Sequence, residues 1–126
     1  RGISTFNTHV RWTLDISSIP AIKLKTGLPI LVDASHGTGR SDLVEPMTLA
    51  GVAAGADGFI VEVHPNPSES ISDAEQALPL ERLDPLLRMV RQVRMVTNPD
   101  WMHDLAVDRT SQPLPCEDGR AFRGEA

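Results

Sequence analysis

The sequence has a single cysteine, no long apolar run and fewer basic than acidic residues. One cysteine, Cys116, cannot form an internal disulfide, so we expect a reducing, cytoplasmic location. No apolar stretch approaches the ~20 residues that a transmembrane helix requires, and we expect no membrane partner. The chain does not open with a charged and then apolar leader, so we expect no secretion signal.

The charge balance disfavours two further classes of partner. Twelve Lys and Arg residues against seventeen Asp and Glu residues leave a formal net charge of -5. A nucleic-acid-binding domain needs a basic face and a peripheral membrane anchor needs a basic cluster, so we expect neither function. With 126 residues, 40% of them hydrophobic and 23% charged, the chain has the composition of one small globular domain.

Two short apolar runs predict the strands of an α/β fold. Residues 28–33 and 58–63 are apolar on both faces, which is typical of buried parallel strands. Between them, apolar residues at helical spacing predict a helix over residues 41–55, provided that Pro46 lies in its first turn. The order of strand, helix and strand predicts a βαβ unit.

Two further helices flank this unit. Apolar residues at helical spacing over residues 12–25 predict a helix with a break at Pro20. A second apolar stripe over residues 83–93 predicts another helix. Its start is ambiguous, because Pro79 and Pro85 can each occupy the first helical position.

The α/β pattern covers residues 1–96, whereas residues 97–126 contain prolines and charges without a sustained period and predict an irregular tail. Two parallel strands alone do not make a viable sheet, because the apolar face of Ile30, Val32 and Ile60 has little to pack against. The chain also does not begin with methionine. We therefore expect the C-terminal part of a larger parallel barrel or sheet, and a marginal or oligomeric fold if the chain stands alone.

Candidate ligands for a metal follow the two predicted strands. His36 and Glu62 lie near the strand ends, where α/β proteins place their functional groups, and strand alternation assigns each to an apolar face. If both faces point into one barrel, the two side chains meet, and Asp73 from the next loop can reach them. One nitrogen and two carboxylate oxygens suit Mn, Fe, Co or Zn, although a closed site typically has a fourth ligand. From the spacing alone, a loop histidine and a solvated glutamate are the more usual interpretation of these residues.

Other polar residues carry weaker hypotheses. His64 is a second candidate ligand, or a residue that only forms hydrogen bonds within its loop. His9 and His103 have no partners in the sequence, so we expect both at the surface. The segment 37–40 could bind an anion through backbone N–H groups or simply form a turn before the next helix. Cys116 has no nearby histidine base, and we interpret it as an incidental thiol.

Five motifs together are more specific than any one of them. They are Arg1–Phe6, Thr13–Ser17, Leu28–His36, Ile60–Pro65 and Ser72–Asp73. In this order and close to this spacing, they resemble the C-terminal third of 3-deoxy-D-arabino-heptulosonate 7-phosphate (DAHP) synthase of the class I-beta type. The resemblance covers roughly residues 1–95.

This resemblance implies a (β/α)8 barrel that condenses phosphoenolpyruvate with erythrose 4-phosphate, the first step of the shikimate pathway. Residues 28–33 and 58–63 would then be the last two barrel strands. Three metal ligands of the family match His36, Glu62 and Asp73. The family's fourth ligand is a cysteine that precedes the segment matched here, and Cys116 does not correspond to it.

The resemblance further implies that Arg1 binds the phosphate of phosphoenolpyruvate. One departure is Ala74, which stands where the family usually has glycine. If the backbone there requires a positive φ, this change could shift Asp73. The missing barrel portion or a second copy of the chain is the expected protein partner. Two alternatives stay open: the related 3-deoxy-D-manno-octulosonate 8-phosphate synthase, and a truncated product without catalytic activity.

Overall fold

The computed structural model describes residues 2–98. The elements are α1 Ser18–Thr26, β1 Leu31–Asp33, α2 Ala34–Thr38, α3 Ser41–Ala53, β2 Gly58–Ile60, β3 Val63–His64, the 3-10 helix η1 Pro67–Glu69, β4 Leu78–Pro79, the 3-10 helix η2 Leu80–Arg82 and α4 Leu83–Thr97. The predicted α/β class is confirmed. None of the helices within residues 2–98 combines the length with the apolar composition that a membrane span requires.

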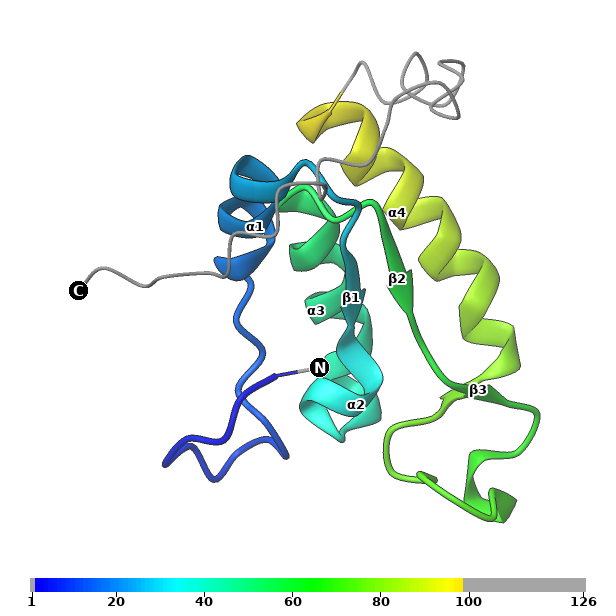
Figure 1. Ribbon diagram of the computed structural model, residues 1–126. Coiled ribbons are helices and arrows are strands. Elements are labelled where there is room, and N and C mark those ends of the chain that lie inside the picture. Colours follow the sequence, from blue (N-terminus) through cyan, green and yellow to red (C-terminus); the bar gives the residue numbers. More distant parts are fainter. Residues whose placement is uncertain (1, 99–126) are drawn as a thin grey trace.

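The predicted βαβ unit is present. β1 and β2 are parallel, with Val32 paired to Phe59 and Asp33 paired to Ile60, and α3 connects them. Both strands run toward the same end of the molecule, where α2 and β3 lie (Figure 1). Because the carboxyl ends of neighbouring parallel strands lie at the same edge of a sheet, the segments that follow β1 and β2 are brought close together.

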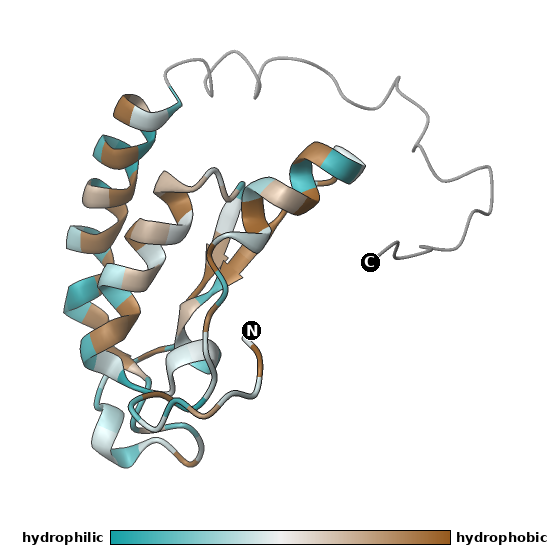
Figure 2. Cartoon of the chain, turned by 90° about the vertical axis from the view of Figure 1, so that its left-hand side faces the viewer, coloured by the Kyte–Doolittle hydropathy of each residue, from teal (hydrophilic) through white to brown (hydrophobic). Residues whose placement is uncertain are grey.

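One face of the strand pair packs against α3 and α4, and this side holds the core. Val32 is buried, and a Cβ atom on Gly51 of α3 would lie 2.7 Å from Val32 Cγ1, so glycine allows α3 to approach β1 closely. Val44 of α3 and Leu86 of α4 belong to a second buried cluster, separate from that of Val32, and are completely buried. Figure 2 shows the hydrophobic strands beside these two helices.

The opposite face of the strands stays open among the described residues. Leu31 is 60% exposed and Ile60 is 43% exposed. The prediction that Val32 and Ile60 share one face is wrong, because Val32 is paired with Phe59 whereas Ile60 is paired with Asp33. In a parallel pair, residues directly opposite each other project to the same face. Val32 therefore faces α3, and Ile60 projects to the open side with Leu31.

The second predicted strand is divided in two. Residues 58–60 pair with β1, but Val63 and His64 form β3, which pairs in parallel with Leu78 and Pro79 of β4. The apolar run 58–63 is continuous in sequence, so nothing within it marks the change of pairing partner. The new partner is β4, to which the chain returns after the loop that follows β3. Leu78 N–H donates to Glu62 O at 2.9 Å and fixes that return. Strand β4 was not predicted.

The N-terminal helix is shorter than predicted. α1 begins at Ser18 rather than near Trp12, because Trp12 N–H donates to Gly37 O and Thr13 forms an antiparallel bridge with Ile3. Pro20 does not break the helix. It lies in the first turn, where the backbone N–H has no partner within the helix.

The other prolines also differ from their predicted positions. Pro46 lies in the second turn of α3, because the first turn is fixed at Ser41, whose N–H donates to Glu75 O. Neither Pro79 nor Pro85 is the first residue of α4. Pro79 precedes η2, and Pro85 falls inside the first turn of α4, where its missing N–H costs no helical hydrogen bond.

An ion pair joins α1 to the loop before β2. Lys23 Nζ donates to Asp57 Oδ1 at 2.8 Å, and Ile30 N–H donates to Asp57 Oδ2 at 2.8 Å. Burial raises the pKa of the Asp57 carboxyl, but hydrogen bonds from Lys23 and Ile30 and the nearby positive charges outweigh it and lower the pKa overall. Asp57 therefore anchors the entry to β1.

Candidate metal centre

The end of β1 turns at once into a short helix, and this turn positions His36. Asp33 is the N-cap of α2, and its carboxylate accepts a hydrogen bond from His36 N–H at 3.1 Å. The prediction that His36 continues the alternation of the strand is therefore wrong. The residue reaches the strand edge from the first turn of α2, since an Asp cap satisfies a helical N–H that would otherwise lack a partner.

The imidazole of His36 lies between two carboxylates. Its Nδ1 is 3.0 Å from both oxygens of Asp33, and its Nε2 is 2.9 Å from Glu62 Oε1. An ionised carboxylate can only accept, so Nδ1 donates to Asp33. This contact fixes the ring and aims Nε2 at Glu62. A carboxylate on the second ring nitrogen is the usual partner of a metal-binding histidine.

Glu62 follows β2 and is held from both its backbone and its side chain. Its N–H donates to Ser35 Oγ at 3.0 Å, which ties the end of β2 to α2. Its Oε2 accepts a hydrogen bond from Gln76 Nε2 at 3.1 Å. The two carboxylate oxygens thus face different groups, His36 on one side and Gln76 on the other.

Asp73 lies in the loop between β3 and β4 and has a left-handed backbone, with φ at 53°. Aspartate is among the few residues other than glycine that adopt this region readily. Ala74 is not among the described residues with positive φ. The left-handed residue is Asp73 itself, so alanine at position 74 introduces no backbone strain.

Arg11 connects Asp73 to the helix that bears His36. Its Nη1 donates to Asp73 Oδ1 at 3.1 Å, and its backbone N–H donates to Thr38 O at 2.9 Å. The Arg11 side chain is 40% exposed, so the ion pair with Asp73 adds orientation more than stability.

The three predicted residues come together. Ligand atoms of His36, Glu62 and Asp73 lie within 4.8 Å of one another, and all three residues are of intermediate burial. Two carboxylates and one imidazole are a donor set that divalent cations such as Mn, Fe, Co and Zn accept. The residues therefore fit three positions of a divalent-cation site.

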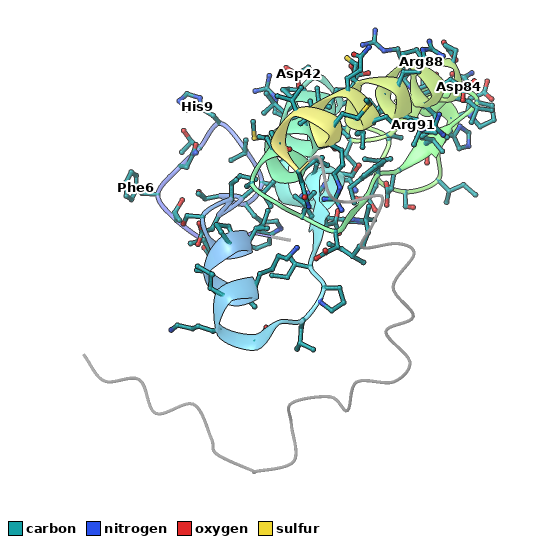
Figure 3. The ribbon with its side chains drawn as sticks, turned by 90° about the horizontal axis from the view of Figure 1, so that it is seen from above. Phe6, His9, Asp42, Asp84, Arg88 and Arg91 are labelled. Carbon is teal, nitrogen blue, oxygen red and sulfur yellow. The ribbon has the colours of Figure 1, made fainter. Side chains whose placement is uncertain are left out.

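The other polar residues considered from the sequence lie away from this cluster or outside the described residues. Within residues 2–98, the hydrogen bonds of the His64 ring stay inside its own loop. Its Nδ1 lies 2.6 Å from Asn66 O and 3.0 Å from Asn66 N. His9 is exposed, as predicted, and projects from the N-terminal segment (Figure 3). Arg1, His103 and Cys116 lie outside the described residues.

The segment 37–40 forms a turn rather than an anion-binding loop. Gly39, with φ at 67°, ends α2 and donates its N–H to Ser35 O. The next N–H groups are also used, since Arg40 N donates to Thr38 Oγ1 and Ser41 N donates to Glu75 O. With these N–H groups already bonded, the turn interpretation is the one that the structure supports.

Three residues of the site were missed from the sequence. Asp33 carried a usable signal, since Asp is a preferred N-cap residue and this one stands where the predicted strand ends. Arg11 and Gln76 come from loops, and their approach to Asp73 and Glu62 depends on how those loops return. No local pattern in the sequence marks either residue.

The fold and the cluster define an α/β chain with a candidate cation site at the carboxyl ends of parallel strands. The chain belongs to the DAHP synthetase I family, whose sequence model matches residues 1–98. The resemblance drawn from the five motifs is thus confirmed.

Individual relatives support the assignment to this family. The chain is 48% identical over 93 residues to a phospho-2-dehydro-3-deoxyheptonate aldolase of Thermotoga maritima, a match that covers 74% of this chain and 28% of the relative. It is 36% identical over 101 residues to a 2-dehydro-3-deoxyphosphooctonate aldolase of Desulfosudis oleivorans, covering 71% of this chain and 36% of the relative. The chain therefore spans about a third of the length of these relatives.

A solved structure shares the fold. The truncated form of 3-deoxy-D-arabino-heptulosonate 7-phosphate synthase from Thermotoga maritima superposes with a TM-score of 0.74 at 47% sequence identity. The match covers 76% of this chain and 37% of that one. At this identity, the likeness extends to the sequence as well as to the fold.

Proposed function

We propose that this chain is the C-terminal portion of a DAHP synthase, which condenses phosphoenolpyruvate with erythrose 4-phosphate. The observation that carries the proposal is the meeting of His36, Glu62 and Asp73 at one edge of two parallel strands, in a chain of the DAHP synthetase I family. In the complete protein, β1 and β2 would be the last two strands of a (β/α)8 barrel. Residues 1–96 would belong to the barrel and residues 97–126 to a tail.

The open face of the strands supports a barrel. Leu31 and Ile60 are apolar, project to the same side and remain exposed in this chain. Inside a parallel barrel, such side chains pack against those of the other strands. The missing barrel portion is therefore the partner that we propose, and we expect the 126-residue chain to have no activity without it.

His36, Glu62 and Asp73 would hold the cation, whose identity among Mn, Fe, Co and Zn is open, and Arg1 would bind the phosphate of phosphoenolpyruvate. The cation would act as a Lewis acid that polarises the aldehyde oxygen of the second substrate. Asp33 orients the His36 ring, and Arg11 holds Asp73 at the same rim. A guanidinium suits the phosphate, since it offers paired N–H donors and neutralises charge within an acidic protein.

A 3-deoxyoctulosonate 8-phosphate synthase is the second candidate. It is favoured by the 36% identity to the Desulfosudis oleivorans aldolase. The 48% identity to the Thermotoga maritima aldolase favours the first candidate.

Thermal unfolding with added Mn²⁺ tests the cation site. A cation that binds the folded chain raises the unfolding midpoint by mass action. We expect a rise for the 126-residue chain and for His9→Ala, which alters an exposed histidine, and no rise for His36→Ala. If added Mn²⁺ does not change the unfolding midpoint of the unaltered chain, the proposed cation site is refuted.

A chimera tests the reaction. Residues 1–98 would replace the matched segment of the Thermotoga maritima relative, so that the rest of the barrel is supplied. We expect turnover of phosphoenolpyruvate with erythrose 4-phosphate, and loss of that turnover with Glu62→Ala. A folded chimera that binds Mn²⁺ but does not turn over these substrates would refute the proposed reaction while leaving the cation site intact.

A further inference from the structure

Gln76 is a fully buried polar residue whose side chain contacts the Glu62 carboxylate of the cluster. The residue has no exposed surface and lies in the turn between Asp73 and β4. Its backbone N–H donates to Asp73 O at 3.1 Å, so the same residue closes the turn that carries Asp73. The next residues, Ala77 and Leu78, are also buried and leave the turn little freedom to shift.

The two polar atoms of the Gln76 amide differ in their surroundings. Nε2 donates to Glu62 Oε2 at 3.1 Å. Oε1 is buried and has no hydrogen-bond partner among the described residues. A buried acceptor without a partner destabilises the fold, and an apolar side chain of similar volume would avoid that penalty. The amide is therefore a poor choice for packing alone, and its donor contact with Glu62 is what distinguishes it.

We infer that Gln76 is a positioning residue for the cation site, an inference that rests on the cation site proposed above. By donating to Oε2, Gln76 restrains rotation of the Glu62 carboxylate and keeps Oε1 on the side of His36 Nε2, 2.9 Å away. Through its backbone, it also holds the turn of Asp73. One buried residue thus sets the orientation of one proposed ligand and the backbone position of another.

A positioning role and a packing role predict opposite results for Gln76→Met. Methionine has a similar volume, removes the Nε2 donor and also removes the acceptor that lacks a partner. If Gln76 positions Glu62, the variant keeps or raises the unfolding midpoint in EDTA, yet binds Mn²⁺ about tenfold to a hundredfold more weakly, as changes to the partners of metal ligands do. If Gln76 serves only packing, stability and affinity change together or not at all.

The experiment measures both quantities in the 126-residue chain. Mn²⁺ affinity is read from the loss of the free-ion electron paramagnetic resonance signal, and the unfolding midpoint is read in EDTA. Gln92→Met makes the same chemical change on the exposed side of α4 and is the matched control. At saturating Co²⁺, we expect the visible absorption of Gln76→Met to shift and that of Gln92→Met to overlay the unaltered chain.

Three results would overturn the inference. Equal Mn²⁺ affinity and identical Co²⁺ spectra in Gln76→Met and the unaltered chain would remove the positioning role. A lower midpoint in EDTA, or a variant that does not fold, would assign Gln76 to packing. Absence of Mn²⁺ binding by the unaltered chain would remove the cation site itself, and that titration alone distinguishes failure of the site from failure of the inference.

Discussion

Gly39 lies against the side chain of Arg11. A Cβ atom on Gly39 would be 2.9 Å from Arg11 Cβ and 3.0 Å from Arg11 Nε. Arg11 passes over this glycine on its way to Asp73. The glycine thus serves two purposes, since it also adopts the positive φ that ends α2.

Gly39→Ala should therefore weaken cation binding as well as stability. Gly27→Ala is the matched control, because Gly27 has nearly the same φ, 66° against 67°, but no atom within 4 Å of the added Cβ. Both variants should lose about 1–2 kcal/mol of unfolding free energy from the left-handed backbone. Only Gly39→Ala should also displace Arg11 and reduce Mn²⁺ affinity. Equal Mn²⁺ affinities in the two folded variants would contradict the expectation.

Asp33→Asn should weaken Mn²⁺ binding about tenfold to a hundredfold, because an amide is a poorer acceptor for His36 Nδ1 and orients the ring less firmly. Asp84→Asn is the control, since Asp84 is exposed on α4 (Figure 3). Calorimetric titration of both variants with Mn²⁺ provides the measurement. If Asp33→Asn and Asp84→Asn bind Mn²⁺ with equal affinity, the contact between Asp33 and His36 does not contribute to the cation site.

The sequence predicted those parts of the fold that depend on local pattern. The helix over 41–55 is confirmed as α3, since its apolar stripe and its end near Gly55 are local features. α2 was missed, because five residues that include Gly37 show no apolar period and are ordered instead by the cap at Asp33. The division of the second strand was missed because the partner of β3 comes from residues 78–79.

The same distinction applies to the site. His36 and Glu62 were predicted to meet because the carboxyl ends of neighbouring parallel strands are adjacent, and their side chains do so. Their assigned roles as ligands stay a prediction. Gln76 and Arg11 could not be found in this way, since each reaches the site from a loop whose path is set by contacts distant in sequence.

Gly51→Ala should destabilise the chain although alanine favours helices. The added Cβ would lie 2.7 Å from Val32 Cγ1, so α3 must move away from β1. Overpacking typically costs about 1–3 kcal/mol, and the gain in helix propensity offsets up to about 1 kcal/mol of that. Urea unfolding measures the difference. Adding Val32→Ala to Gly51→Ala should relieve the clash, so the double variant should lose less unfolding free energy than the sum of the two single changes. If the two losses simply add, the clash is not the cause.

Asp57→Asn should lower stability at neutral pH and reduce its loss in acid. The pKa of Asp57 is lowered in the folded chain, so its stabilisation is complete above the unfolded value near pH 4 and disappears as pH falls through the folded pKa. We expect a loss of about 1 kcal/mol at pH 7, because a hydrogen bond to a charged, partly exposed group contributes on that scale.

Unfolding of both chains across pH 2–7 measures this dependence, and the two curves should converge below about pH 4. Asp42→Asn, which removes an exposed ion pair with Arg40, should change stability little at neutral pH. A difference between Asp57→Asn and the unaltered chain that persists at pH 2 would show that the carboxylate charge is not the cause.

The pairing of Asp33 with Ile60 also determines which residues can share an ion. If β1 slipped by one position along β2, the segment after β1 would shift by one strand residue relative to Glu62, and His36 would lose its alignment with that carboxylate. An ion bound by the cluster therefore stabilises only the correct strand alignment. In a strand pair with just three paired positions, the ion would favour the native alignment of β1 and β2.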